Sequence, residues 1–105
     1  VIAVLDMGYS LLEDCGFTRA EAVRATGRLV MRNIENVLEA GCDGALTGPI
    51  ERNDIETVKK HIACMQNDDS DDVRLYKMLG TKLVNIAEKK NPDKDYTQMM
   101  ELLRG

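Results

Sequence analysis

Apolar residues recur at three- and four-residue spacing along most of the chain, and this spacing predicts α-helices. The stripes are separated by short segments that contain glycine, proline or several aspartates. No segment shows the alternation of apolar and polar residues that is typical of exposed strands. We therefore expect an all-α fold, a compact bundle of about five helices. The stripes lie within residues 1–15, 19–40, 55–65, 71–90 and 96–104.

The run Val1–Leu5 has a competing interpretation, because β-branched residues are dense there and short apolar runs also form buried strands. As the first strand of a dinucleotide-binding domain, it would have to be followed by G-x-G-x-x-G. Only Gly8 and Gly16 follow, at the wrong spacing. The helix is therefore the favoured prediction for this run.

Helix boundaries are marked by local signals. Gly16 is expected to end the first helix, and Thr18 with Glu21 forms a capping-box pair for the second. Gly41 is expected to end the second helix near Ala40. The inward face of that helix reads Val23, Gly27, Val30, Ile34, Val37 and Leu38.

Two further helix starts are predicted from capping residues. Asn53, with Glu56 three residues later, is the expected N-cap of the third helix. Ser70 is the expected N-cap of the fourth, and Asp71 and Asp72 then face the positive end of its dipole. Gly27 and Gly80 lie on helix faces, where their small size would permit close approach of another helix.

The charge is concentrated in one segment. The 105 residues carry a net charge of −4. An acidic chain without a basic stripe argues against nucleic acid or an anionic membrane as a partner. The longest apolar run, Val1–Leu5, is too short to span a bilayer. Four aspartates account for the whole excess of negative charge: Asp68, Asp69, Asp71 and Asp72.

The cysteines bear on the cellular compartment of the protein, and the first residue bears on whether the chain is complete. Cys15, Cys42 and Cys64 are odd in number and lack C-x-x-C spacing, so we expect reduced thiols and no metal site. With no signal peptide visible, a cytoplasmic location is expected. The chain begins with Val1, so we expect it to be a piece of a longer protein.

The least periodic segment, residues 41–53, contains Thr47-Gly48-Pro49. These three residues predict a tight, stiff turn that carries a hydroxyl group close to a helix N-terminus. Such a turn is either purely structural or shapes a ligand site, and the residues alone leave both interpretations open. Arg52 likewise either binds an anion or forms a surface ion pair with Asp54.

His61 is the only histidine, and it shares one helix face with Asp54 and Thr57. A side chain that titrates near neutral pH suits general acid–base work. A histidine beside an apolar face is also commonly a hydrogen-bonded structural residue. Asp54 and Thr57 either orient the imidazole, or Asp54 simply caps the helix.

The segment Ala45–His61, A-L-T-G-P-I-E-R-N-D-I-E-T-V-K-K-H, resembles the pattern A-L-T-G-P-x-x-R-G-D-x-x-T-V-x-x-H. That pattern belongs to the C-terminal helical domain of Rossmann-like oxidoreductases catalogued as domain of unknown function 2520. Asn36–Glu39 and Leu75–Gly80 also fit the family, and the resemblance covers about residues 1–90. Asn53 replaces the usual glycine, but Asn also tolerates a left-handed backbone.

The resemblance implies a fold similar to the C-terminal domain of 6-phosphogluconate dehydrogenase, which completes a substrate cleft and commonly forms a homodimer. It implies NAD(P) in the full-length protein, bound by an N-terminal Rossmann domain absent from this chain, so that the chain alone would be inactive. By the same resemblance, His61 is the candidate catalytic residue. Candidate substrate-binding residues are Thr47, Arg52, Asp54 and Thr57, and Gly48 and Pro49 would shape the loop.

Two functions from different classes therefore remain. The first is the substrate-binding and dimerisation domain of an NAD(P)-dependent oxidoreductase that acts on an unidentified small molecule. The alternative is a non-catalytic helical module for protein–protein interaction. Gly27, Gly80 and the methionine-rich C-terminal segment favour helix–helix association in either case.

Overall fold

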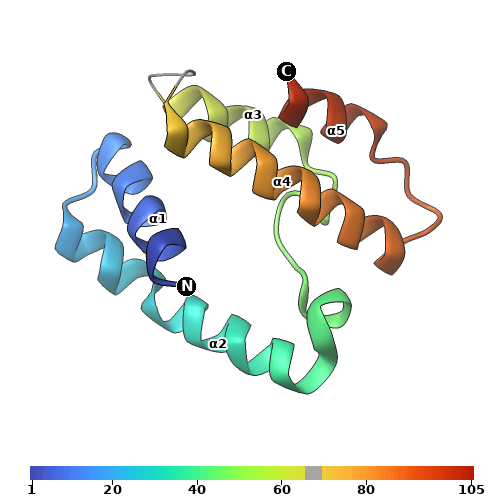
Figure 1. Cartoon of the computed structure of the whole chain (residues 1–105), viewed down its shortest axis with the longest axis horizontal. Helices are drawn as coiled ribbons and strands as arrows, with labels where there is room; N and C mark the ends of the chain where they lie inside the picture. Colours follow the sequence, from blue (N-terminus) through green and yellow to red (C-terminus); the bar gives the residue numbers. More distant parts are fainter. Residues whose placement is uncertain (66–69) are drawn as a thin grey trace.

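The computed structural model describes residues 1–65 and 70–105, which form five α-helices joined by loops (Figure 1). Neither stretch contains a β-strand, so the predicted all-α bundle is confirmed and Val1–Leu5 is not a strand. No helix within these stretches combines the length and apolarity needed to cross a membrane. The helices are α1 (Ile2–Asp14), α2 (Arg19–Ala45), α3 (Ile55–Cys64), α4 (Asp71–Lys90) and α5 (Thr97–Arg104).

The main core lies in the C-terminal half of the chain, where α5 packs against both α4 and α3 (Figure 1). The loop before α3 contributes Ile50 to this core. Tyr96, predicted as the first residue of the last helix, instead lies at its N-cap position and is 2% exposed. The fully buried side chains of this core include Val58, Val84, Ala87, Met99 and Leu103.

The corner between α1 and α2 follows the sequence prediction. Gly16 adopts φ 104° just after α1, a conformation that favours glycine. The capping box is present: the Thr18 hydroxyl accepts the Glu21 N–H at 3.1 Å, and the Glu21 carboxylate accepts the Thr18 N–H at 2.9 Å. Arg19 strengthens the corner through an ion pair with Glu13 at 2.9 Å.

The predictions for α2 need two corrections. The chain does not leave the helix at Gly41: it kinks there, with φ 76° and ψ 175°, and is helical again up to Ala45. The stripe expected to face inward is largely exposed, with Leu38 81% and Ile34 45% accessible. Nothing lies within 4 Å of the position that a Cβ of Gly27 would occupy, so no helix approaches closely there.

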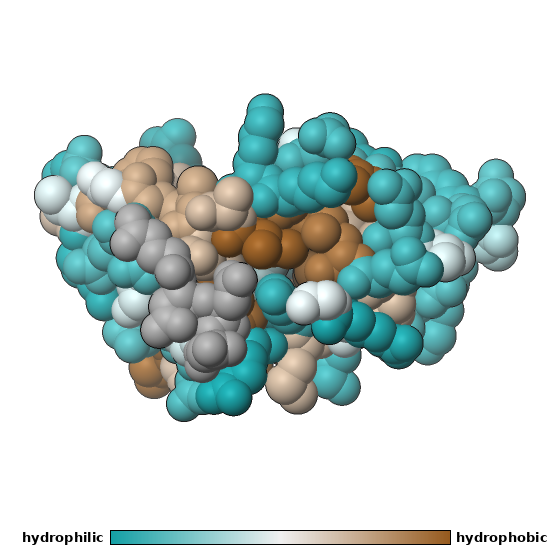
Figure 2. Space-filling model, turned by 90° about the horizontal axis from the view of Figure 1, so that it is seen from above, coloured by the Kyte–Doolittle hydropathy of each residue, from teal (hydrophilic) through white to brown (hydrophobic). Residues whose placement is uncertain are grey.

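The apolar stripe of α2 is largely exposed because α1 covers only the first half of α2. Thr26 and Val30 of α2 line a hollow together with residues of α1, and the later turns of α2 extend beyond α1 (Figure 1). Hydrophobic side chains also gather at the centre of the surface seen from above, between hydrophilic borders (Figure 2). The chain therefore leaves part of its apolar surface accessible.

The start of α4 agrees with its prediction. The Ser70 hydroxyl accepts the Val73 N–H at 3.2 Å, and Asp71 and Asp72 occupy the first turn. Asp68 and Asp69 lie outside the described residues. Gly80 does face a close neighbour, because a Cβ there would lie 2.8 Å from a methyl carbon of Leu103.

Candidate functional site

The loop between α2 and α3 is a tight double turn that carries the predicted motif. The Arg52 N–H donates to the Gly48 carbonyl at 3.0 Å, and the Asp54 N–H donates to the Pro49 carbonyl at 2.8 Å. Gly48 has φ 106° and Asn53 has φ 59°. The predicted turn at Thr47-Gly48-Pro49 is therefore present, and Asn53 takes the left-handed conformation expected of it.

The N-cap of α3 is Asp54, which corrects the prediction of Asn53. The Asp54 carboxylate accepts the Thr57 N–H at 3.1 Å and the Thr57 hydroxyl at 2.7 Å. Asn53 has a left-handed φ of 59°, whereas an N-cap residue has an extended backbone, and its side-chain amide donates to the Asp95 carbonyl at 2.8 Å. Asn53 thus links the loop to the C-terminal segment, and the next residue, Asp54, caps α3 instead.

Asp54, Thr57 and Arg52 form one polar cluster at the start of α3. Hydrogen bonds from Thr57, hydroxyl first and then backbone N–H, lower the pKa of the Asp54 carboxyl, with a smaller contribution from Arg52. Asp54 is therefore ionised at neutral pH and suits positioning rather than proton donation. Arg52 contacts it at only 3.9 Å and is 59% exposed, which leaves guanidinium donors accessible to an anion.

A second set of contacts fixes the loop from the other side. The Lys90 ammonium group donates to the Leu46 carbonyl at 2.7 Å and lies 3.7 Å from the Glu51 carboxylate. The Tyr96 hydroxyl donates to the Glu51 carbonyl at 2.6 Å, and the Asn91 amide donates to that hydroxyl at 3.0 Å. Local spacing in the sequence did not indicate these contacts, because Lys90 and Leu46 are 44 residues apart and Tyr96 and Glu51 are 45 residues apart.

His61 lies on α3 but does not join the polar cluster. Within the described residues, no hydrogen bond links it to Asp54 or Thr57, so Asp54 acts as a cap. The imidazole Nδ1 instead lies 3.5 Å from the Tyr76 hydroxyl of α4. His61 is exposed, and its side chain stands at the edge of a pocket between α1, α3 and α4.

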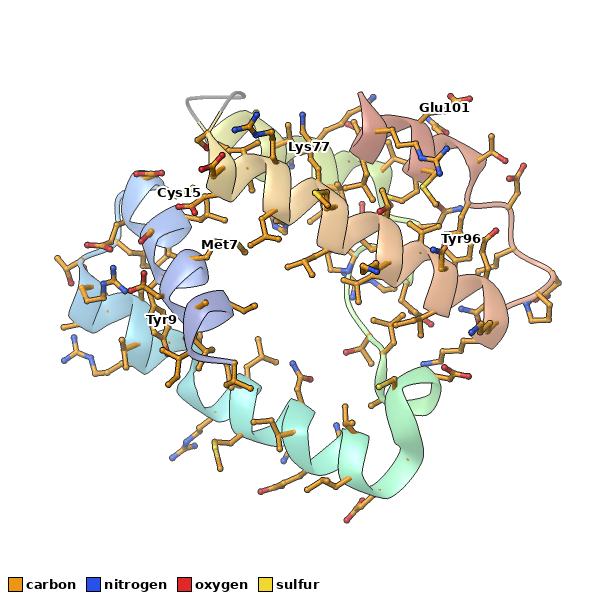
Figure 3. All side chains as sticks on the ribbon, in the orientation of Figure 1. Met7, Tyr9, Cys15, Lys77, Tyr96 and Glu101 are labelled. Atoms are coloured by element: carbon orange, nitrogen blue, oxygen red, sulfur yellow. The ribbon has the colours of Figure 1, made fainter. Side chains whose placement is uncertain are left out.

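This α1–α3–α4 pocket has a volume of about 320 Å³ and an almost entirely apolar lining. Met7 points toward it from α1 (Figure 3). Burial raises the pKa of the Tyr76 phenol, so this hydroxyl stays protonated at neutral pH. Tyr76 was not among the predicted site residues, although a tyrosine on an inward helical stripe was a usable signal. The lining comprises Val4, Met7, Gly8, Leu11, Leu12, Cys15, His61, Cys64, Met65 and Tyr76.

Two cysteines meet at the rim of the α1–α3–α4 pocket. The Cys15 thiol lies 3.9 Å from the Cys64 carbonyl, and all three cysteines of the chain are free. Desolvation, followed by the neighbouring Cys64 thiol, raises the pKa of Cys15. Cys15 is therefore mainly a neutral thiol at pH 7 and no candidate nucleophile.

Thr47 lies in a different place from His61. It is exposed and lines a hollow of about 330 Å³ between α2 and α4, together with Val37, Leu83 and Ile86. The predicted residues therefore divide into three groups. Arg52, Asp54 and Thr57 are in contact with one another, while Thr47 and His61 each line a separate hollow.

The chain offers no dinucleotide site of the Rossmann type. Such a site requires a strand, a glycine-rich turn and a helix N-terminus. The stretches 1–65 and 70–105 contain no strand, and the sequence contains no G-x-G-x-x-G.

Comparison with known sequences identifies one family. Residues 1–83 match the family described as "Domain of unknown function (DUF2520)". Neither the curated proteins nor the solved structures include a significant match. Because the match covers most of the sequence, from α1 into the second half of α4, this chain belongs to the DUF2520 family.

Proposed function

We propose that the chain is the substrate-binding and dimerisation domain of an NAD(P)-dependent oxidoreductase. In this proposal a separate N-terminal Rossmann domain of the same polypeptide binds the nucleotide, and the chain alone is inactive. The resemblance of Ala45–His61 to helical domains of Rossmann-like oxidoreductases supports it. Nothing among the described residues competes for the nucleotide.

The observation that carries the proposal is the accessible apolar face on the second half of α2. Ile34, Val37 and Leu38 are 45%, 40% and 81% exposed, and they follow one another at helical spacing. Contiguous apolar surface of this kind marks sites that another protein surface covers. A domain that packs against a second copy and a partner domain would bury this face.

The motif residues suit a substrate-positioning role. The loop holds Arg52 beside the Asp54–Thr57 cap, so its accessible guanidinium donors would meet a polar group of the substrate in a fixed place. Thr47, Gly48 and Pro49 would shape the wall of the cleft. His61 would act as the general acid or base, because it is accessible and imidazole is a side chain commonly used for proton transfer.

The test compares the complete protein with this chain. The complete protein is expected to bind NADPH in a calorimetric titration, whereas the isolated chain is expected to give no binding heat. Binding by the isolated chain, or failure of the complete protein to bind, contradicts the proposal.

Two single substitutions in the complete protein test the motif. His61→Asn and Arg52→Gln are expected to lower NADPH-dependent reduction of small carbonyl compounds. Arg24→Gln, at an exposed position of α2, is the matched control and is expected to leave the rate unchanged.

A non-catalytic interaction module is the second candidate, and the same face of α2 favours it. The two candidates differ in what the substitutions do. If His61→Asn and Arg52→Gln leave turnover intact while Gly27→Leu abolishes dimerisation, the interaction module is the better description. Gly27 is suitable because no other described residue lies within 4 Å of the position that its Cβ would occupy, so a loss of dimerisation would report on a partner surface.

A further inference from the structure

We propose that the α1–α3–α4 pocket binds a small, mainly apolar organic molecule that carries one acceptor oxygen, such as an uncharged ketone or aldehyde. The binding itself is independent of any reaction. The inference deepens the proposed function and rests on it only for naming this molecule as the substrate.

The size and the lining of the α1–α3–α4 pocket suit a small apolar molecule. A dry apolar cavity of about 150 Å³ is large enough to hold benzene. The α1–α3–α4 pocket, at about 320 Å³, is roughly twice that size and lies at the lower end of the range for small-molecule sites. Its walls come from three helices, and leucine, valine and methionine make up half of the lining residues. An apolar molecule larger than a single ring would fit.

The absence of charge in the lining narrows the ligand class. The described lining residues include no Asp, Glu, Lys or Arg. A charged ligand would lose its hydration there without gaining a counter-charge, which is costly. The hollow beside α5 is different, because Glu88, Lys94, Asp95 and Glu101 line it. The α1–α3–α4 pocket therefore selects uncharged molecules.

The Tyr76 hydroxyl supplies the polar contact. It stays protonated at neutral pH because burial raises the pKa of Tyr76. Its nearest polar neighbour among the described residues, Nδ1 of His61, lies 3.5 Å away, beyond the usual length of a hydrogen bond from a hydroxyl group. The phenol therefore has a donor to give to a ligand oxygen, and His61 lies beside the same atom.

The two groups are arranged as a site that polarises a carbonyl group would require. Tyr76, a partly buried neutral donor, lines the pocket, and the accessible imidazole of His61 lies next to its hydroxyl group. The apolar walls then hold the remainder of the ligand. This arrangement carries the inference from a general apolar pocket to a ketone or aldehyde.

Binding is tested on the 105-residue chain with two probes of similar shape, acetophenone and ethylbenzene. Methyl NMR signals of Met7, Leu11 and Leu12 are expected to shift with both probes. Gly8→Phe blocks the pocket: Gly8 lines it, and nothing lies within 4 Å of its Cβ position, so the helix tolerates the change. The added ring is expected to lower both affinities by about tenfold or more, because it occupies the ligand's space.

Ala3→Phe is the matched control. It adds the same ring to the same helix at an exposed position outside the lining, and both affinities are expected to stay unchanged. Circular dichroism of both variants establishes that they fold. Loss of binding in Ala3→Phe, or no loss in Gly8→Phe, overturns the proposed location.

Tyr76→Phe tests the polar contact. It keeps the ring that packs in the pocket and removes only the hydroxyl group. The preference for acetophenone over ethylbenzene is expected to fall by about three- to tenfold, the range of one net hydrogen bond. An unchanged preference overturns the role of Tyr76 and with it the assignment of an oxygen-bearing ligand.

Thiol labelling gives an independent readout. Bound acetophenone is expected to slow alkylation of Cys15 and Cys64 at the rim, whereas Cys42, outside the lining, keeps its rate. Equal protection of all three thiols contradicts the location. If neither probe binds and Gly8→Phe instead changes the oligomeric state, the pocket is a protein interface and the inference is wrong.

The two proposals fail separately. If the probes bind but the complete protein does not bind NADPH, the oxidoreductase proposal is refuted and the pocket proposal stands. If Gly8→Phe leaves NADPH-dependent turnover unchanged, the oxidoreductase proposal stands, but the pocket is not its substrate site.

Discussion

The Tyr96 hydroxyl donates a hydrogen bond of 2.6 Å to the backbone carbonyl of Glu51. Tyr96 is 2% exposed and lies just before α5, whereas Glu51 lies in the turn that carries the family motif. The Asn91 amide donates to the same hydroxyl at 3.0 Å. The C-terminal segment thus holds the motif loop in place, although the family match ends at residue 83.

Tyr96→Phe is expected to lower the free energy of unfolding by about 1–3 kcal/mol, because it leaves the partners of a buried hydroxyl unpaired. Urea unfolding followed by circular dichroism measures the change. Amide hydrogen exchange at Arg52 and Asp54 should also become faster, since the loop loses its anchor.

Tyr9→Phe is the control for this substitution. Tyr9 lies on α1, and its ring stacks under Arg19 at 5.5 Å, a contact that phenylalanine can also make. Its stability is expected to change little. Equal destabilisation by both substitutions would refute the anchoring role of Tyr96.

Local signals in the sequence were sufficient for the helices and for most of their ends. The Thr18–Glu21 capping box, the Ser70 cap and the turn at Gly16 were all predicted and are present. Each of these depends on residues within a few positions of one another, so spacing alone reveals it. Asn53 shows the limit: its spacing to Glu56 suggested a cap, but its backbone is left-handed and its amide donates to the distant Asp95 carbonyl.

Contacts between distant segments could not be predicted in this way. Apolar spacing identified the stripe on α2 but could not tell whether this chain or another surface covers it. Likewise, His61 was found as the only histidine, but its neighbour Tyr76 depends on how α4 packs against α3. The sequence therefore identified the candidate residues. It could not show which of them lie close together, because that depends on how the helices pack.

Thr57→Val is expected to raise the pKa of Asp54, because the Thr57 hydroxyl is the main cause of its lowering. The folded pKa lies below the unfolded value, so the ionised carboxyl stabilises the fold at neutral pH. This stabilisation is lost as the pH falls below about 4. The difference in stability between wild type and Thr57→Val should therefore shrink on acidification.

Carboxyl carbon NMR titration measures the pKa, and urea unfolding at several pH values measures the stability. Thr26→Val is the control, since its hydroxyl donates to the Ala22 carbonyl on α2. It should leave the Asp54 titration unchanged. An unshifted Asp54 in Thr57→Val would contradict the assignment of Thr57 as the main cause.

Two glycines in helices are expected to respond oppositely to alanine. Gly8→Ala should raise the free energy of unfolding by about 0.5–1 kcal/mol, because alanine favours the helix and nothing lies near its methyl group. At Gly80 the methyl group would lie 2.8 Å from a Leu103 carbon that is itself buried. Overpacking costs about 1–3 kcal/mol, which outweighs the gain in propensity.

Chemical denaturation of the two single variants provides the comparison. Gly80→Ala should lower the stability and Gly8→Ala should raise it, under identical conditions. Stabilisation by both would mean that Leu103 moves aside freely and that Gly80 is not a close contact between α4 and α5.

The exposed half of α2 leads to the prediction about assembly. If this face forms the proposed dimer interface, Leu38, which is 81% exposed in the monomer, becomes buried there. Burial of one leucine contributes about 1.5–3 kcal/mol, so replacing it with a charged residue should weaken association by at least about tenfold. Sedimentation equilibrium of Leu38→Lys against wild type measures the dissociation constant.

Leu75→Lys is the matched control, because Leu75 is an exposed leucine of α4 at 38% accessibility and is not part of the α2 face. It makes the same chemical change, and adds the same charge, without touching the proposed interface. The wild type and Leu75→Lys should therefore dimerise equally, while Leu38→Lys should be mainly monomeric at the same concentration. A monomeric wild type at high concentration, or equal weakening by both substitutions, would exclude this face as the dimer interface.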